Sequence, residues 1–217
     1  MARLNRGGSS RALRAELMPQ GFAGEVLRLV AETWQGFTLH RSVRLEERVT
    51  ALFATALEDA YVAQGRSWFV FPEIPINDPT FGTQTGRNDL RFYHRNIPGQ
   101  RNFFTVECKR LRVTTSSGFR HLAAEYVDEG LQRFADGKYA ADLSCGAMVG
   151  YVMDNDITSA FATVQAEIDA KRRPLKMRGP LRIPCSLLAT EQFSAESSHV
   201  RANGDFTTYH LLVGVPK

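Results

Sequence analysis

A short apolar run at residues 145–153 constrains the fold of this 217-residue chain more than any other segment. The run is far shorter than the ~20 residues that a membrane-spanning helix needs, so it indicates a buried strand. A helix is expected before it, over residues 125–140, and a helical crossover returns the chain in the same direction. We therefore expect a strand that is parallel to its neighbour and buried on both faces.

The first half of the chain predicts two helices followed by three strands. Apolar periodicity indicates helices at 22–34 and 42–64, the second with Ser42 as its N-cap and Gly65 as its stop. Strands at 68–76, 88–94 and 102–111 are expected to form a meander, with a loop at 77–87 and a Pro-Gly turn at 95–100. Pro72 and Pro75 place the first of these strands near an edge or at a bend.

The second half predicts alternating helices and strands. After the helix at 125–140 and the strand at 145–153, we expect a helix at 157–173 with Asn155 or Asp156 as its cap, and strands at 181–188 and 206–215. The whole order predicts an α/β fold with a mixed β-sheet core flanked by helices. We expect residues 16–217 to form a single domain, preceded by a flexible basic arm at residues 1–15.

Basic residues are concentrated in three segments, although the net charge of the whole chain is only +4. The arginines of the arm all precede the first acid of the chain, Glu16. The segment 87–120 is strongly basic, and the segment 171–182 contains no acid. Such segments suit a polyanion such as nucleic acid, which they would contact through its phosphates. Solvated surface runs give the same pattern, so charge alone leaves both interpretations open.

Cysteine usage and the N-terminal sequence point to a reducing compartment. The three cysteines, Cys108, Cys145 and Cys185, form no CxxC pair and have no zinc-like spacing, so we expect small buried residues rather than disulfides or a structural metal. The N-terminus lacks the apolar region of a signal peptide. We expect a soluble cytoplasmic protein that is neither exported nor inserted into a membrane.

Charged side chains interrupt two neighbouring strands of the expected meander. Asp89 lies on the second strand, and Glu107 and Lys109 lie on one face of the third, with Cys108 on the other. Burying such charges is costly unless they are paired or coordinate an ion. Two converging carboxylates repel one another, and a divalent cation would remove the repulsion and bind phosphate oxygens and water. A solvated ion pair is the alternative explanation.

This pattern, spread over residues 42–153, resembles the PD-(D/E)XK nuclease superfamily, which has the restriction-endonuclease-like fold. The resemblance implies that Asp89 and Glu107 bind Mg²⁺ (or Mn²⁺), that Cys108 offers its backbone carbonyl, and that Lys109 assists the attacking water. Asn88 stands where the proline of the superfamily's name is found. Because that proline is not a ligand, its replacement weakens the match little.

An acid from the helix at 42–64 is a further candidate, because the superfamily carries one there. If Leu45 and Val49 lie on the buried face, Glu46 lies on its flank and Glu47 points to solvent. We therefore expect Glu46 to reach a second metal or its water shell. The alternative is that both glutamates pair with surface cations.

Candidate substrate contacts come from the basic flanks and from the helix after the motif. Several superfamily members carry a glutamine and a tyrosine on this helix, which suggests Gln132, although its spacing from Tyr139 is wider here. Lys138 could reach a phosphate or simply complement the helix C-terminus. The possible substrate contacts are Gln132, Lys138, Arg110 and Arg91.

The resemblance implies a magnesium-dependent phosphodiesterase, an endo- or exodeoxyribonuclease, with nucleic acid, expected to be DNA, as its partner. By analogy it is similar to effectors of bacterial restriction or anti-phage defence systems, in which a protein partner or a second copy supplies recognition or activation. The alternative is an inactive nuclease-fold subunit that binds nucleic acid or serves as a scaffold in a complex. A third class is an unrelated α/β enzyme acting on mononucleotides.

Overall fold

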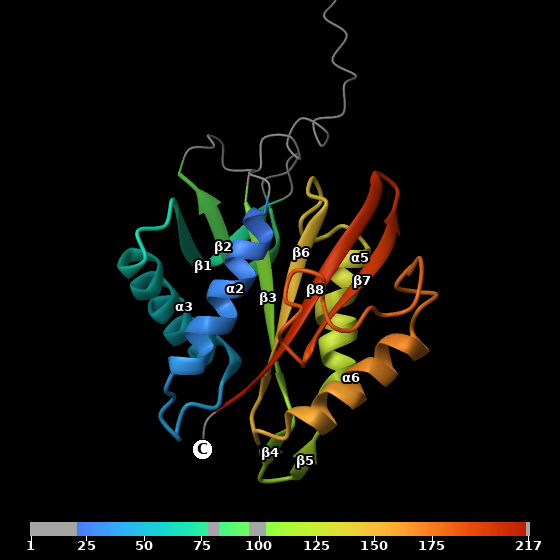
Figure 1. Ribbon diagram of the computed structural model, residues 1–217. Helices are drawn as coiled ribbons and strands as arrows, with labels where there is room; N and C mark the ends of the chain where they lie inside the picture. Colours follow the sequence, from blue (N-terminus) through green and yellow to red (C-terminus); the bar gives the residue numbers. More distant parts are fainter. Residues whose placement is uncertain (1–20, 78–82, 96–102, 216–217) are drawn as a thin grey trace, which may run out of the picture.

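The computed structural model describes residues 21–77, 83–95 and 103–215, and within them six strands form one mixed sheet (Figure 1). The strand order is β1 (Trp68–Asn77), β2 (Gln84–His94), β3 (Phe104–Leu111), β6 (Cys145–Val152), β8 (Gly204–Gly214) and β7 (Ser194–Arg201). The first three strands are antiparallel to one another, β6 is parallel to both neighbours, and β7 is antiparallel to β8. The predicted α/β class, the meander and the buried parallel strand β6 are therefore confirmed.

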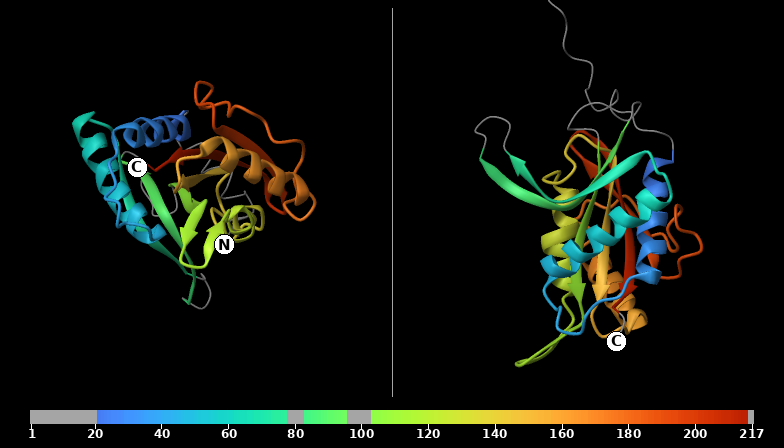
Figure 2. Two further views of the ribbon diagram at one scale, coloured as in Figure 1. Left: turned by 90° about the horizontal axis from the view of Figure 1, so that it is seen from below. Right: turned by 90° about the vertical axis from the view of Figure 1, so that its left-hand side faces the viewer.

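Helices cover both faces of this sheet (Figures 1 and 2). On one face lie α2 (Phe22–Gly36) and α3 (Glu46–Ala63). On the other lie α6 (Ile157–Ala170) and a continuous helical segment composed of α4 (Ala123–Glu125), the π-helix η1 (Tyr126–Leu131) and α5 (Gln132–Ala135). The sheet thus separates two hydrophobic cores.

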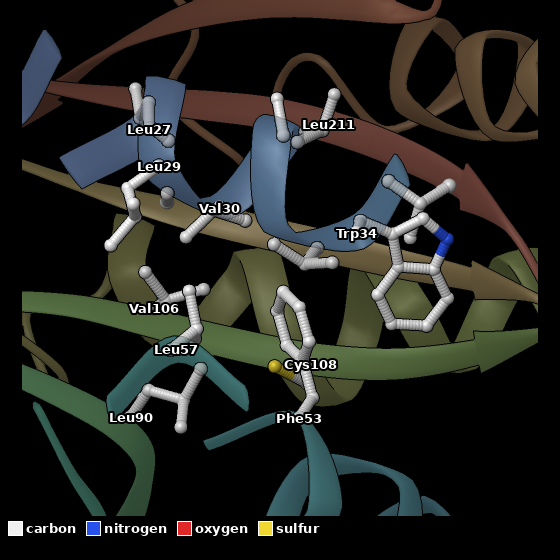
Figure 3. Packing of buried hydrophobic residues seen from close by; sticks show 14 of the residues in the cluster. Leu27, Leu29, Val30, Trp34, Phe53, Leu57, Leu90, Val106, Cys108 and Leu211 are labelled. Carbon is white, nitrogen blue, oxygen red and sulfur yellow. The ribbon is translucent and has the colours of Figure 1, made fainter. Parts of the chain in front are cut away.

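The core beneath α2 and α3 is rich in aromatic side chains. The Trp34 ring stacks on Tyr151 with 5.1 Å between ring centroids, and Phe53 meets Trp34 edge to face at 4.9 Å. The side chain of Cys108 points into this core beside Phe53 (Figure 3) and is fully buried. All three cysteines lie in the described part of the chain as free thiols, with Cys108 and Cys185 buried and Cys145 half-buried.

The second helix begins later than the sequence predicts. It starts at Glu46 with Leu45 at the N-cap position and no side-chain cap, so the prediction of Ser42 as the cap is wrong. The Ser42 hydroxyl lies 2.7 Å from His40 Nδ1 instead. Gly65, with a φ of +61°, follows the end of the helix, as expected for a residue that reverses the chain there.

Three further predicted elements have different bounds in the structure. Residues 84–87, expected in a loop, belong to β2 and pair with β1, for example Arg87 with Pro75. The helix expected at 125–140 spans 123–135 and ends where Gly137 takes a φ of +75°. The helix α6 ends at Ala170 rather than at 173, and Asp156 caps it by accepting a hydrogen bond from Ser159 N at 3.1 Å.

The strand predicted at 181–188 is wrong. These residues form turns, with a single isolated bridge from Arg182 to Glu196, and the strand lies instead at β7. Pro180 and Pro184 lack amide donors, which explains the first error. The buried side chains of β7 include Ser194, Ser197 and His199, so the strand has no apolar alternation to reveal it.

A small hairpin, β4 (Val113–Thr115) and β5 (Gly118–Arg120), was not predicted. In the right-hand view of Figure 2 the hairpin and the β1–β2 ribbon both project on the side of the sheet where α5 lies. Across residues 21–77, 83–95 and 103–215, none of the helices has the length and apolar character to cross a membrane. The expected basic arm at 1–15 and residues 96–100 of the expected turn at 95–100 lie outside the described residues.

Candidate active site

The candidate site lies where β2 and β3 stop pairing. The ladder between them contains the pairs Leu90–Val106, Arg91–Thr105 and Phe92–Phe104, and it ends before residue 89. At that point the Asp89 carboxylate accepts a hydrogen bond from Cys108 N at 2.7 Å. The Asp89 side chain thus replaces the next main-chain hydrogen bond between the two strands. This bond keeps Asp89 beside the Glu107-Cys108-Lys109 segment.

Glu107 and Lys109 lie on the face of β3 opposite Cys108, as the alternation predicts. The Glu107 side chain is only 2% exposed, and Lys109 Nζ lies 3.0 Å from its Oε1 atom. The same ammonium lies 3.0 Å from Glu46 Oε1 and donates to the Cys108 carbonyl at 3.2 Å. Lys109 therefore links a buried glutamate on the sheet to a glutamate at the start of α3.

Glu46 is the acid of α3 that faces this site. Its Oε1 accepts from Lys109 Nζ and its Oε2 accepts from Arg110 N at 2.8 Å, whereas Glu47 is exposed. The predicted orientation of the two glutamates is confirmed, but the predicted centre of the buried face is not. Leu45 is 45% exposed, and the buried stripe runs through Val49, Thr50, Phe53, Ala54, Leu57 and Tyr61. Glu46 points along the middle of that stripe and not along its flank.

Burial of the carboxylates changes the pKa values of the site. Burial raises the pKa of Glu107 to about 8, and the negative charge of Asp89 adds to this rise. Burial also raises the pKa of Asp89, against the opposing effect of Lys109. Burial alone would lower the pKa of Lys109, but the charges of Glu107, Glu46 and Asp89 outweigh it and raise the pKa above its usual value. Lys109 is therefore held protonated.

The donor atoms fit a divalent cation of the magnesium type. Glu107 Oε2 is buried and has no hydrogen-bond partner among the described residues. Hard cations such as Mg²⁺ and Mn²⁺ prefer oxygen ligands, and Asp89, Glu107 and the Cys108 carbonyl are all oxygen donors. In the part of the chain that the structure describes, no group of three or more His, Cys, Asp or Glu side chains is arranged to hold a metal ion. The expected ligands of the first metal include only two side chains, because the third donor is a main-chain oxygen. Glu46, the acid expected to reach a second metal or its water shell, instead accepts hydrogen bonds from Lys109 Nζ and Arg110 N.

Arg133, in α5, and Tyr139, which follows the end of the helical segment, interact electrostatically with Glu107, and Gln132 does not. The charge of Arg133 partly opposes the rise in the pKa of Glu107. Burial, and after it the charge of Glu107, raises the pKa of Tyr139. The Gln132 amide instead donates to Pro174 O at 3.3 Å, and Lys138 is exposed. The π-helix η1 adds a residue to one turn, which rotates every later residue relative to a regular helix. Arg133, which sequence reasoning missed, is the residue of α5 whose charge acts on Glu107.

The two remaining candidates, Arg91 and Arg110, lie on either side of the carboxylates. Arg91 Nε donates to Asn88 Oδ1 at 2.7 Å, and its guanidinium lies 4.3 Å from the centre of the Phe103 ring. Arg110 Nη1 donates to Arg44 O at 2.6 Å, which ties β3 to the segment before α3. Arg91 thus lies on the sheet face that carries Asp89, and Arg110 braces the start of α3.

A separate buried polar chain crosses β7 and β8. Tyr126 Oη lies 3.0 Å from His210 Nδ1, Ser197 Oγ lies 2.9 Å from His210 Nε2 and 2.8 Å from His199 Nε2, and His199 Nδ1 lies 2.8 Å from Leu175 O. Because the Leu175 carbonyl only accepts, His199 carries its proton on Nδ1. Ser197 then donates to His199 and accepts from His210, which in turn accepts from Tyr126.

This chain of hydrogen bonds is complete only when both histidines are neutral. Burial lowers the pKa of His199 to about 4 and that of His210 to about 3. An added proton would turn both ring nitrogens of a histidine into donors, so the hydroxyl that donates to that ring would lose its acceptor. The chain therefore braces the far side of the sheet, and both histidines are buried within it.

No protein-family model, no curated protein and no solved structure matches this chain. The function is therefore inferred from the residues of the site and from the pattern that they form in the sequence.

Proposed function

We propose that this chain is a divalent-metal-dependent nuclease that hydrolyses phosphodiester bonds of nucleic acid, with DNA as the expected substrate. One observation carries the proposal. Asp89, Glu107, Lys109 and Glu46, which come from three different elements, meet where β2 and β3 separate. The convergence of these residue types supports phosphoryl-transfer chemistry, because that chemistry needs metal-binding oxygens beside a fixed cation.

Asp89 and Glu107 would hold the metal, together with the Cys108 carbonyl. A bound divalent metal would act as a Lewis acid on the phosphate and lower the pKa of a bound water molecule. The partnerless Glu107 Oε2 is the atom most in need of a cation, since an unpaired buried carboxylate oxygen is costly. Asp89 keeps Oδ2 on the Cys108 amide, which fixes the direction in which its carboxylate points.

Lys109 would orient the attacking water and stabilise negative charge on the phosphate. Its position is fixed, because the ammonium lies 3.0 Å from both Glu46 and Glu107. It is not suited to removing a proton, because the surrounding carboxylates keep it charged. Glu46 acts as a positioning residue in this scheme, since it holds both Lys109 and the Arg110 amide.

Arg133 offers a second positive charge to a phosphate above the carboxylates. Its guanidinium donates to the Tyr139 hydroxyl, and Arg133 comes from the helical segment on the same side of the sheet as Glu107. Arginine suits phosphate because its planar donors match the phosphate oxygens. A phosphate held between Arg133 and Lys109 would lie next to the proposed metal ligands.

A cleavage assay tests the proposal directly. Linear, circular and single-stranded DNA and RNA are each incubated with the protein in Mg²⁺, Mn²⁺ or EDTA. We expect cleavage with metal, none in EDTA, and none with Glu107→Ala, whereas Glu47→Gln serves as the exposed matched control. Metal-dependent cleavage that survives in Glu107→Ala would contradict the assignment of the site.

The same assay separates the alternative functions. A metal titration that shows no binding, together with tight binding of uncleaved polymer, would favour the inactive nucleic-acid-binding or scaffold subunit. Turnover of mononucleotides without polymer cleavage would favour the unrelated nucleotide enzyme.

A further inference from the structure

An aromatic patch lies on the same sheet face as the carboxylates. We define it as Phe69 and Phe71 of β1, Tyr93 of β2, and Phe103, which precedes β3. The rings form a continuous set: Phe69 and Phe71 lie 5.3 Å apart between centroids, Phe71 and Tyr93 5.8 Å, and Tyr93 and Phe103 5.8 Å. Phe69 also stacks on Tyr93 at 6.2 Å with an angle of 27° between the rings.

The patch continues the line of site residues along β2. Side chains two positions apart on a strand share a face and lie about 7 Å apart, so Asp89, Arg91 and Tyr93 follow one another along one face. On β3 the matching residues are Glu107, Thr105 and Phe103, by the pairing of Arg91 with Thr105. The face therefore carries carboxylates first, then a cation, and then aromatic rings, with Tyr93 ~14 Å from Asp89 along the strand.

The exposure of these rings is unusual for a core. Phe71 is 45% exposed, and Phe69, Tyr93 and Phe103 are half-buried. The opposite faces of β1 and β2 bury Trp68, Val70, Leu90 and Phe92 beneath the helices. Phe69 packs against the edge of that core and Phe103 against the other core, whereas Phe71 and Tyr93 belong to neither cluster of described residues. A contiguous exposed apolar surface next to a polar site is typical of a ligand surface.

The charges around the patch specify the ligand. The Arg91 guanidinium lies over the Phe103 ring at 4.3 Å, between the other rings and the carboxylates. A ligand that covers both Arg91 and the rings must combine negative charge with flat apolar groups at a regular spacing. Single-stranded nucleic acid has this combination, because its phosphates carry the charge and its unpaired bases expose their faces. In a duplex the base faces are already stacked on one another.

We infer that the aromatic patch is a stacking surface for unpaired bases, and that the substrate class of the proposed nuclease is single-stranded nucleic acid or a single-stranded end. This inference rests on the proposed function, which sets the path of the bound nucleic acid. The nucleic-acid strand runs from the patch past Arg91 to Asp89 and Glu107. Bases stack on the Phe69, Phe71 and Tyr93 rings, and Arg91 meets the phosphate between them and the carboxylates.

Binding without metal tests the patch independently of cleavage. Fluorescence anisotropy in EDTA measures the Kd for a labelled single-stranded oligonucleotide, for the same sequence as a duplex, and for an abasic strand of equal length. We expect the single strand to bind most tightly and the abasic strand at least about fivefold more weakly, since stacking of one base is worth this much. Equal affinity for the single strand and the abasic strand would overturn the inference.

Variants assign the effect to the patch. Phe71→Ala should weaken single-strand binding at least about fivefold, and Phe71→Trp should retain or tighten it. Phe119→Ala is the matched control, because Phe119 is also 45% exposed but lies on β5, away from the patch. Melting temperatures show whether each variant is folded, and Tyr93→Ala provides a second test if Phe71→Ala is not.

The two proposals fail in different ways. Unchanged binding in folded Phe71→Ala and Tyr93→Ala, with cleavage of DNA by the wild type, would overturn the stacking surface and leave the nuclease assignment intact. Loss of single-strand binding in these variants, with no metal-dependent cleavage by the wild type, would support the stacking surface and contradict the nuclease.

Discussion

The Asp89 carboxylate accepts the Cys108 amide hydrogen at 2.7 Å, so a side chain of β2 satisfies a main-chain group of β3 at the point where the two strands separate. The bond does two things at once. It satisfies a backbone donor beside a buried part of β3, and it fixes an acidic group next to Glu107. The aspartate therefore has a structural role that is separable from its proposed chemical one.

Two substitutions of Asp89 separate these roles. Asp89→Asn retains an oxygen for the Cys108 amide, so we expect near wild-type stability and loss of metal-dependent cleavage. Asp89→Ala also removes the acceptor, and we expect it to lower the free energy of unfolding by a further ~1–3 kcal/mol. Chemical denaturation and the cleavage assay measure the two effects. Equal stability of the two variants would show that the hydrogen bond contributes little.

The raised pKa of Glu107 predicts how stability depends on pH in EDTA. The folded-state pKa of about 8 lies above the ordinary value of 4.5, so the folded state binds this proton more tightly than the unfolded state. Its stabilising contribution is full below pH 4.5 and is lost as the pH rises through 8. Glu107→Gln cannot ionise, so the difference between its melting temperature and that of the wild type should increase as the pH rises over this range. Mg²⁺ should raise the melting temperature of the wild type more than that of Glu107→Gln. Parallel pH profiles of the two melting temperatures would contradict a raised pKa of Glu107.

Lys109 and Glu46 should be coupled in a double-mutant cycle. Lys109→Ala leaves Glu107 and Glu46 without their shared cation, and breaking a largely buried pair costs ~3–5 kcal/mol. Adding Glu46→Gln removes one of the uncompensated charges, so the double variant should be less destabilised than the sum of the single variants. Thermal and urea unfolding measure the cycle. Additive effects would show that the two side chains do not interact.

Glu46 and Glu47 form a matched pair for activity. Glu46→Gln should lower cleavage, because it weakens the hold on Lys109, whereas Glu47→Gln should not, because Glu47 is exposed. A magnesium titration of both variants shows whether Glu46 affects metal affinity, which would indicate the second-metal role that the sequence suggested. Loss of activity confined to Glu47→Gln would contradict the positioning role.

The chain formed by Tyr126, His210, Ser197 and His199 predicts a loss of stability in acid. The pKa of His199 is lowered to about 4 from the 6.5 expected when unfolded, so the unfolded state takes up this proton first. The contribution of His199 to the free energy of unfolding is present above pH 6.5 and falls by about 3 kcal/mol as the pH drops to 4. His199→Gln should flatten this part of the pH profile, and His40→Gln, at an exposed histidine, should not. An unchanged slope in His199→Gln would place the acid sensitivity elsewhere.

The sequence predicted the parts of the fold that depend on local periodicity and strand alternation. Alternation placed Glu107 and Lys109 on one face of their strand and Cys108, expected to be buried, on the other, and the structure confirms this arrangement. The parallel orientation of β6 followed from the helix that precedes it. These features are determined by residues near one another in the chain or by the geometry of a crossover.

The errors come from tertiary effects that a single sequence does not reveal. The buried serines and histidines of β7 satisfy one another across strands, so the strand lacks an apolar pattern. The π-helix η1 rotates the residues after it, so the charge of Arg133 acts on Glu107 while Gln132 contacts Pro174 O. Nothing in the composition of that helix signals the extra residue in its turn.

The two outer strands of the sheet differ from ordinary edge strands, with a consequence for self-association. At one edge, Pro72 and Pro75 remove amide donors from β1, and at the other, the segment before β7 forms isolated bridges from Met177 to His199 and from Arg182 to Glu196. An uncovered edge with its full set of donors is a template for strand addition and aggregation. Both edges of this sheet are therefore protected, so copies of the chain that associate should do so through side-chain surfaces and not by extending the sheet.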